Sequence, residues 1–281
     1  QPRQGGQAGA GGQGGQGGGA GQGGVGGQAG APDASVPPMP DAGPPDVAPR
    51  LDAAERKDAA IVDTAPPPPP PPPPWTACPA QGDCRILALG DGLAEGVGSG
   101  DMGGFRSRLY RLATADGKRV TMVGRLLAGP NNTPRNHEGH RDHFTVPNGM
   151  RAGLTTVLAA ALTNAKPNIV ILNIGSEDVN ANYELGTIDT RIGRIVDDIA
   201  KAAPDALIVL STIPPAAPNN GTFNNRASQA NTRILAVVRT RREAGLHIMA
   251  AGMDGGFKSF GSVRNGLHAN NRFYPNDAGY A

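Results

Sequence analysis

The sequence predicts an α/β fold, a three-layer α/β/α sandwich built around a five-stranded parallel sheet. About 200 residues from Trp75 onward have the composition of a globular domain and can bury one sizeable core. Short apolar runs alternate there with stretches of helical periodicity, a pattern typical of parallel sheets. The longest apolar run, 168–175, has no polar alternation and so predicts a strand buried on both faces.

The other elements follow the same alternation. Apolar runs predict five strands at 85–90, 119–124, 168–175, 206–211 and 247–251. Helical spacing of apolar residues predicts helices at 105–115, 150–165, 187–203 and 223–244. The stretch 125–149 has no periodicity and many Asn, His, Pro and Gly residues, so we expect a loop. Such a sheet is covered by helices on both faces, and its site lies beyond the carboxyl ends of the strands.

Two segments of biased composition precede this domain. Residues 1–30 are almost entirely Gly, Gln and Ala, and residues 31–75 form a Pro/Ala/Asp-rich linker that ends in nine consecutive prolines, Pro66–Pro74. Neither segment can bury enough apolar surface to offset chain entropy, so both are expected to be disordered. The proline run predicts a stiff polyproline II spacer. The folded domain is therefore expected to cover 76–281.

Charge and hydropathy limit the classes of partner. The formal net charge is +2, which is too small to indicate a nucleic-acid partner. The chain has no run of about 18 apolar residues, so no transmembrane segment is expected. It begins at Gln1, so a signal peptide would lie outside this sequence. A long linker ahead of a folded domain suggests an exported, extracellular or cell-surface protein.

The two cysteines lie at the entrance to the domain. Cys78 and Cys84 have five residues between them. In an oxidising compartment they could close a small loop as a disulfide. Two free thiols are the alternative, and the sequence leaves both open.

The segments at the predicted strand ends resemble one family of hydrolases. They include Leu-Gly-Asp-Gly at 89–92, Asn-His-Glu-Gly-His at 136–140 and Asn-Gly-Leu-His at 265–268. Further similar segments lie at 98–109, 123–124, 166–178 and 203–215. In this order they resemble the SGNH (GDSL-type) hydrolases, with their flavodoxin-like fold. Within that superfamily they are most similar to secreted carbohydrate esterases of the acetyl xylan esterase kind.

The resemblance assigns a role to each matching position. In such enzymes a serine after Gly-Asp attacks the ester carbonyl, and a histidine oriented by an aspartate three residues earlier deprotonates it. The serine N–H, a glycine N–H and an asparagine side chain hold the oxyanion. These roles fall on the following residues: Gly92 for the nucleophile, Gly139 and Glu177 for the other oxyanion donors, Asn265 for the aspartate, and His268 for the base. Asp91 and Asp178 are their neighbours.

Three of these positions carry the wrong residue for the chemistry. Gly92 has no side chain to attack, Glu177 would repel an oxyanion when ionised, and Asn265 cannot balance an imidazolium. His268 is retained. In the second block, Arg141 and Asp142 stand where the family usually has a small residue and a glycine.

These departures predict an ester hydrolase by family that is catalytically impaired. The alternative is a non-catalytic carbohydrate-binding or surface-displayed module that uses the same cleft. An active hydrolase with an altered mechanism, in which His268 or Glu177 activates water, is a further alternative. A polysaccharide or another ester-bearing molecule is the partner that the resemblance implies, and no cofactor is expected.

Three other features have ordinary explanations. His137, His140 and His143 are spaced three apart, but the resemblance accounts for the first two, so no metal is expected. Three arginines of the first predicted helix are expected on a solvated face rather than in a binding patch; they are Arg106, Arg108 and Arg111. Asn276–Tyr280 begins the last helix in the family, with about six extra residues after His268, so that helix is expected to be truncated at Ala281.

Overall fold

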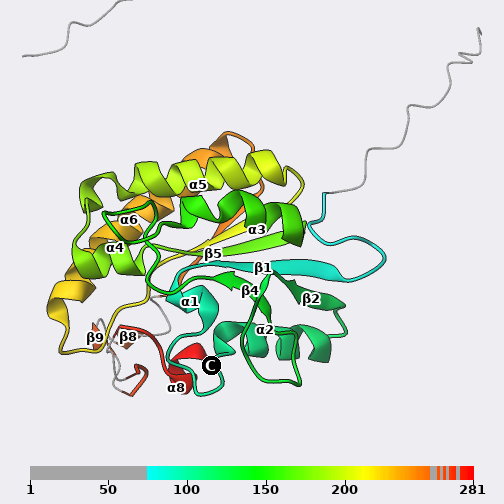
Figure 1. Cartoon of the computed structure of the whole chain (residues 1–281), viewed down its shortest axis with the longest axis horizontal. Coiled ribbons are helices and arrows are strands. Elements are labelled where there is room, and N and C mark those ends of the chain that lie inside the picture. Colours follow the sequence, from blue (N-terminus) through cyan, green and yellow to red (C-terminus); the bar gives the residue numbers. More distant parts are fainter. Residues whose placement is uncertain (1–74, 254–257, 260–261, 264–265, 270–272) are drawn as a thin grey trace, which may run out of the picture. The chain divides into compact units, whose positions relative to one another are not determined.

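The structure is a computed structural model that describes residues 75–281, apart from 254–257, 260–261, 264–265 and 270–272 (Figure 1). The expectations for residues 1–74 therefore concern residues outside the described range. So does the expectation for Asn265. Everything below refers to the described residues, which lie within one compact unit of the chain.

A seven-stranded sheet forms the centre of this unit. Its strands are β1 (Cys84–Gly90), β2 (Val120–Val123), β3 (Leu126–Leu127), β4 (Asn136–Gly139), β5 (Ile169–Asn173), β6 (Leu207–Ser211) and β7 (Ile248–Ala251). The order is β3-β4-β1-β5-β6-β7, and β2 also pairs with β1. The five predicted strands are all present, as β1, β2, β5, β6 and β7, and they pair in parallel. The predicted fold class is confirmed.

The prediction of a plain loop over 125–149 is wrong, because this stretch adds two short strands. β4 pairs in parallel with the last two residues of β1. β2 pairs with the same edge of β1 nearer to the start of that strand, along Cys84–Leu87. β3 pairs antiparallel to β4, which makes the sheet mixed. The sequence of β4, Asn-His-Glu-Gly, has no apolar pattern to reveal a strand. Its pairing brings Glu138 and Gly139 beside the end of β1.

Helices lie on both sides of the sheet. The longer ones are α2 (Gly104–Ala115), α3 (Leu158–Ala165), α5 (Ile188–Ala202) and α6 (Gly221–Glu243). Short helices are α1 (Gly92–Glu95), α4 (Ser176–Ala181), α8 (Asp277–Tyr280), and the 3-10 turns Leu154–Thr156 and Leu185–Thr187. A small hairpin joins β8 (Lys258–Ser259) and β9 (Ser262–Val263).

The predicted helix at 150–165 is helical only from Leu154 onward. Its first part bonds to Phe144 instead: Phe144 N donates to Ala152 O, and Leu154 N donates to Phe144 O. These bonds hold Gly153 in an extended conformation, so the backbone cannot enter a helix there.

One face of the sheet is fully covered, and the other only in part. Figure 1 shows α3, α5 and α6 on one side and α1, α2 and α8 on the other. On the first face, Val170, Leu172, Ile208 and Leu210 are buried against the predicted apolar stripe of α5. On the α2 side, Met249 is 44% exposed, and its neighbours on β5 and β6 are only half-buried. Among the residues that the structure describes, the expected cover on both faces is therefore incomplete over β5–β7.

The prediction that Arg106 faces solvent is wrong. Its side chain is 1% exposed and donates to the carbonyl oxygens of Ala94, Met102 and Ala128. Burial lowers the pKa of Arg106 to about 10. It therefore ties α1, α2 and the segment after β3 together from inside, while Arg108 and Arg111 are exposed as expected.

The entrance to the domain is fastened in two ways. Cys78 and Cys84 form a disulfide, with Cα atoms 4.9 Å apart. Trp75 stacks on His247, with ring centroids 3.7 Å apart, at the start of β7. In the described part of the chain, none of the helices combines the length and apolar character needed to cross a membrane.

Candidate active site

The Gly90–Gly92 turn joins the ends of β1 and β5. Gly90 has φ +143°, and a Cβ atom there would overlap the carbonyl group of Asn173, so only glycine allows these strands to approach. Asp91 caps α1 by accepting a hydrogen bond from Leu93 N at 3.0 Å. Its other oxygen accepts from Ser176 N at 3.0 Å, at the start of α4. The carboxylate thus positions the two segments that carry Gly92 and Glu177.

Asp91 is fully buried and has no cation beside it. Burial raises the pKa of its carboxyl from 3.8 to about 7, although the two backbone N–H groups lower it. Among the described residues, no Lys or Arg side chain forms an ion pair with Asp91. The group is a structural acid that is costly to ionise.

Tyr274 fills the space in front of Gly92. A Cβ atom at position 92 would lie against the Tyr274 hydroxyl and 2.5 Å from its Cζ atom. The Tyr274 side chain is only 3% exposed, so it is packed into this position rather than resting on the surface. A side chain at position 92 and the phenol of Tyr274 therefore exclude each other.

A short backbone closure holds Tyr274 in place. Ala269 N donates to Tyr274 O at 2.9 Å, and Asn276 N donates to Leu267 O at 3.0 Å. His268 and Pro275 form an isolated bridge between these two bonds. The described residues on either side of 270–272 are therefore paired with each other, and Tyr274 lies on the second of these two segments.

Glu177 is the hydrogen-bond partner of Tyr274. The hydroxyl of Tyr274 donates to Glu177 Oε1 at 2.6 Å, and the glutamate is 4% exposed. Burial raises the pKa of Glu177, and the bond from Tyr274 only partly offsets it. Burial also raises the pKa of Tyr274, and the negative charges of Asp91 and Glu177 add to this. Tyr274 is therefore a neutral phenol whose hydroxyl donates a hydrogen bond to the carboxyl group of Glu177.

One hydrogen-bond partner of His268 is the carbonyl group of Pro215, on the loop that follows β6. Its Nε2 atom lies 2.8 Å from Pro215 O, which can only accept, so Nε2 carries the proton in this contact. A general base needs an unprotonated ring nitrogen directed at the nucleophile. In this geometry Nε2 carries a proton and therefore has no free lone pair with which to accept one from a nucleophile.

Gly139 lies where the resemblance places a second oxyanion donor. A Cβ atom there would come within 2.6 Å of Glu95 Cα, so glycine is required by the packing of α1 on β4. Its N–H donates to His137 Nδ1 at 3.0 Å. Burial lowers the pKa of His137 to about 4, so the ring is neutral and can accept this bond. The N–H is thus already in use.

Glu138 and Arg141 form ion pairs beside this position. Glu138 is fully buried and accepts from Arg125 Nε at 2.8 Å and from His140 Nε2 at 3.1 Å. Burial alone would raise the pKa of Glu138, but the bonds from His140 and Arg125 outweigh it and lower the pKa to about 2. Arg141 binds Glu95 through its backbone N and its Nε, each at 2.9 Å. Arg141, which stands where the family usually has a small residue, therefore forms a salt bridge with Glu95.

Asp178, the neighbour of Glu177, belongs to a buried network. It accepts from Thr145 N at 2.9 Å and from the Thr145 hydroxyl at 2.7 Å. Arg191 of α5 donates to Asp178 at 3.0 Å and to the Thr145 hydroxyl at 2.8 Å. This network anchors α4 and the long loop to α5, so Asp178 supports the site without facing it.

The three loop histidines do not converge on one point. His137 Nδ1 faces the N–H of Gly139, His140 Nε2 faces Glu138, and the rings of His140 and His143 lie 4.9 Å apart. Within the described ranges, no group of three or more His, Cys, Asp or Glu side chains is placed to hold a metal ion. The donor set therefore does not fit a bound metal.

The structure thus brings together Gly92, Glu177 and Asp91 of the predicted site residues. It adds Tyr274, which sequence reasoning missed, as well as Arg125 and Arg191. The only sequence signal for Tyr274 was the insertion of about six residues after His268. That signal indicates extra chain but does not say which side chain it delivers.

An open α/β sheet with a Gly-Asp turn at the end of its first strand places the candidate site at the carboxyl ends of the strands. A family model described as the GDSL-like lipase/acylhydrolase family matches residues 88–281. The chain belongs to this family. A comparison with curated protein sequences found no match.

Several solved structures are similar. A Clostridium thermocellum family 3 carbohydrate esterase is 24% identical over 71% of this chain and 90% of its own, with a TM-score of 0.60. A carbohydrate esterase family 3 protein from Talaromyces cellulolyticus is 20% identical over 70% and 90% of the two chains, with a TM-score of 0.55. An acetyl esterase variant with a bound acetate ion is 19% identical over the same shares, also with a TM-score of 0.55. At these identities the similarity establishes the fold.

Proposed function

We propose that this domain is a carbohydrate (acetyl) esterase by descent that has lost serine esterase activity, and is thus a pseudoenzyme. One observation carries the proposal: the phenol of Tyr274 occupies the space into which a side chain at position 92 would project. The similarity of fold to family 3 carbohydrate esterases supports the descent.

Each requirement of serine ester hydrolysis is affected. Position 92 offers no oxygen, the N–H of Gly139 is bound to His137, and Glu177 is a carboxyl group held by Tyr274. Loss of one oxyanion donor costs roughly 100- to 1,000-fold in rate. Loss of the nucleophile alone costs about as much as loss of a whole triad, on the order of a million-fold. Ester hydrolysis should therefore be undetectable above background.

A direct attack by water is also disfavoured. Glu177 is the carboxyl group nearest to Tyr274, and it is buried and hydrogen-bonded to that side chain. A general base must reach the proton of an attacking water, directly or through one further water. The packed phenol takes the place that such a water would need.

A second candidate is binding of a polysaccharide without catalysis. A cavity of about 370 Å³ lies next to Gly139, lined among others by Leu127, His140, Arg141 and His143. It combines an exposed apolar side chain with ring faces and a charged group, a mixture that suits a sugar. Binding of acetylated xylan oligosaccharides that is lost in His143→Ala and kept in Arg239→Ala would support this candidate.

An extracellular or cell-surface location completes the proposal. The Cys78–Cys84 disulfide supports it, because such bonds persist in oxidising compartments. Cell fractionation, followed by thiol labelling and mass analysis of the recovered protein, would test this. Recovery from the cytoplasmic fraction alone, with two free thiols, would count against export.

Hydrolysis of an activated acetyl ester tests the main proposal. The set is the wild type, Gly92→Ser, Gly92→Ser/Tyr274→Ala, and the last combined with Glu177→Asn and Asn265→Asp. We expect background rates for the first three and a rise only in the last, where the phenol is removed and the serine, the oxyanion donor and the aspartate are all restored. Adding His268→Ala to the most active variant is the matched control, since it should abolish the gain. Saturable hydrolysis by the wild type would refute the proposal.

A further inference from the structure

The phenol ring of Tyr274 belongs to a cluster of apolar and aromatic side chains in front of Gly92. The other members of this cluster are Leu93, Val97, Phe105, Phe273 and Tyr280. The rings of Phe273 and Tyr274 lie 4.3 Å apart between their centroids. Because the whole chain has only four Tyr and six Phe residues, this is a local concentration of rings. The cluster encloses the phenol with apolar and aromatic surface, which favours binding of a further ring.

One polar group faces this enclosed phenol. The carboxyl group of Glu177 accepts the hydrogen bond of the Tyr274 hydroxyl at 2.6 Å, and Glu177 is 4% exposed. Among the described residues, Glu177 takes part in no ion pair. A buried carboxyl group without a cation requires a hydrogen-bond donor. The site therefore combines an apolar wall for a ring with one acceptor for a hydroxyl group, and this combination recognises a phenol.

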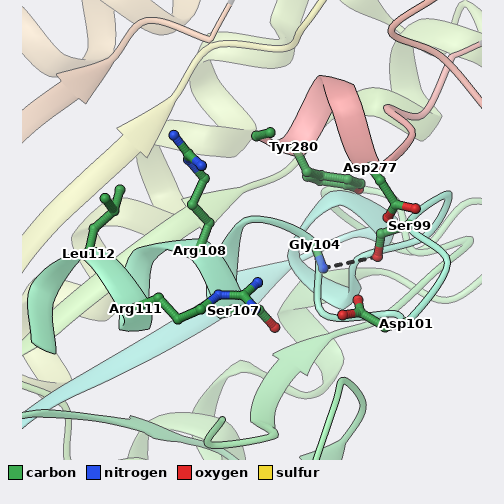
Figure 2. A pocket seen from close by; sticks show the side chains of 10 residues that line it. Ser99, Asp101, Gly104, Ser107, Arg108, Arg111, Leu112, Asp277 and Tyr280 are labelled. Carbon is green, nitrogen blue, oxygen red and sulfur yellow. Dashed lines mark hydrogen bonds between the residues drawn. The ribbon is translucent and has the colours of Figure 1, made fainter. Parts of the chain in front are cut away.

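Tyr280 differs from Tyr274 in the partner of its hydroxyl group. The Tyr280 hydroxyl donates to the backbone carbonyl group of Val97 at 2.8 Å. Its ring also lines a cavity of about 400 Å³ between α2 and α8, which Figure 2 shows. Tyr280 is thus part of the wall of the site and is bonded to the backbone. Tyr274 instead fills the space that this wall encloses.

The walls and the occupant come from different parts of the chain. The walls include α1 and α4, and Asp91 joins these two helices by accepting from Leu93 N and Ser176 N, each at 3.0 Å. Neither bond involves Tyr274, which reaches the site from the segment that follows 270–272. We therefore expect the site to keep its shape when the phenol is absent.

We propose that the space in front of Gly92 is a binding site for a phenolic ligand, and that Tyr274 occupies it as an internal, autoinhibitory ligand. In the wild type the phenol is tethered beside its site, so a free phenol competes against a group of high effective concentration. Removal of the ring leaves an apolar cavity, and cavities of this kind bind small aromatic molecules. The inference rests on the proposed function in that the cleft no longer serves catalysis.

Tyr274→Ala provides the test, with phenol and benzene as a matched pair of probes. Phenol replaces both the ring and the hydroxyl group that the substitution removes, whereas benzene replaces the ring alone. We expect an excess of phenol to raise the Tm of Tyr274→Ala. Calorimetry should show that phenol binds roughly tenfold or more tightly than benzene, because its hydroxyl group bonds to Glu177. The wild type and Tyr110→Ala, at a half-buried position of α2, should show neither effect.

A second variant tests the role of the carboxyl group. Adding Glu177→Met to Tyr274→Ala keeps the cavity but removes the acceptor, so phenol and benzene should then bind alike. If Tyr274→Ala does not fold alone, refolding in phenol should restore a cooperative thermal transition, and refolding in benzene should do so less effectively.

Three results would overturn the proposal: no stabilisation of Tyr274→Ala by phenol, equal effects of benzene and phenol on it, or equal stabilisation of the wild type. None of them bears on the loss of serine chemistry, which is measured separately by ester hydrolysis.

Discussion

Two groups of buried carboxyl groups meet at the carboxyl ends of the strands, and they differ in their partners. Glu138 and Asp178 each bind an arginine, Arg125 and Arg191 respectively. Asp91 is bound by backbone N–H groups, and Glu177 by the neutral phenol of Tyr274. Accordingly the pKa of Glu138 is lowered to about 2, whereas the pKa of Asp91 is raised to about 7.

This difference separates the carboxyl groups that support the fold from those at the positions where the family's chemistry takes place. The ion-paired carboxylates hold β4, α4 and α5 in the arrangement of the family fold. The second group, around Gly92, no longer fits an oxyanion and instead packs a phenol against a buried acid. A fold of this kind can keep its polar supports while its reacting positions change, since function depends on the site and not on the fold.

The largest effect is expected from breaking the scaffold pair of Asp178. Arg191→Met leaves a fully buried carboxylate without its cation and should lower the free energy of unfolding by about 3–5 kcal/mol. Arg194→Met, an exposed position of the same helix, should change it by less than about 0.5 kcal/mol. Chemical denaturation of both variants measures this. Equal effects would mean that the Asp178 network does not support the fold.

The next effect concerns the space in front of Gly92. Gly92→Ala should lower the free energy of unfolding by about 1–3 kcal/mol, because the new methyl group must displace Tyr274. The same change in a Tyr274→Ala background should cost far less, which a double-mutant cycle would show. Gly221→Ala, where no atom lies within 4 Å of the added Cβ, is the control. A cost that persists without Tyr274 would place the clash elsewhere.

An effect of similar size is expected from the hydroxyl of Tyr274. Tyr274→Phe leaves Glu177 buried without its donor and should cost about 1–3 kcal/mol, at the lower end if Glu177 takes up a proton. Tyr110→Phe, at a half-buried position of α2, should stay within about 0.5 kcal/mol. Thermal unfolding of the two variants separates them. Identical melting temperatures would remove Tyr274 from the account of the site.

The last prediction is a contrast in the direction of pH dependence rather than in the size of an effect. The raised pKa of Asp91 means that its protonated form stabilises the fold below about pH 4, a contribution lost as the pH rises through about 7. The stability advantage of wild type over Asp91→Asn should therefore shrink between pH 4 and pH 8. Glu138 has a lowered pKa, so the advantage over Glu138→Gln should be present above about pH 4.5 and shrink as the pH falls toward 2. Parallel slopes for the two pairs would contradict the comparison.

The sequence predicted most of the strands and helices correctly, because their positions follow from local patterns of apolar residues. Apolar runs located β1, β5 and β6, and the periodicity of α5 identified its buried stripe. The polar strand β4 was missed because its pairing depends on space left beside β1 rather than on its own residues. Arg106 was misplaced because three carbonyl oxygens from other segments, which no helical pattern reveals, satisfy its buried guanidinium.

From the sequence, the site could be predicted only in terms of the catalytic groups that it lacks. The sequence segments around Gly92 and Glu177 showed that a nucleophile and an oxyanion donor are replaced. What replaces them could not be inferred, since Tyr274 and Glu177 lie 97 residues apart in sequence and meet only in the folded chain. The role of Asn265 stays a prediction, since that residue lies outside the described range.

The central claim is that position 92 and its surroundings cannot perform serine chemistry. Intact-mass analysis after incubation with a serine-directed fluorophosphonate tests it most directly, with Gly92→Ser/Tyr274→Ala/Glu177→Asn/Asn265→Asp treated in parallel as the reactive reference. We predict no mass increase for the wild type and a single adduct at position 92 in the reference. A stoichiometric adduct on the wild-type protein would show that it holds an activated serine elsewhere and would contradict the account.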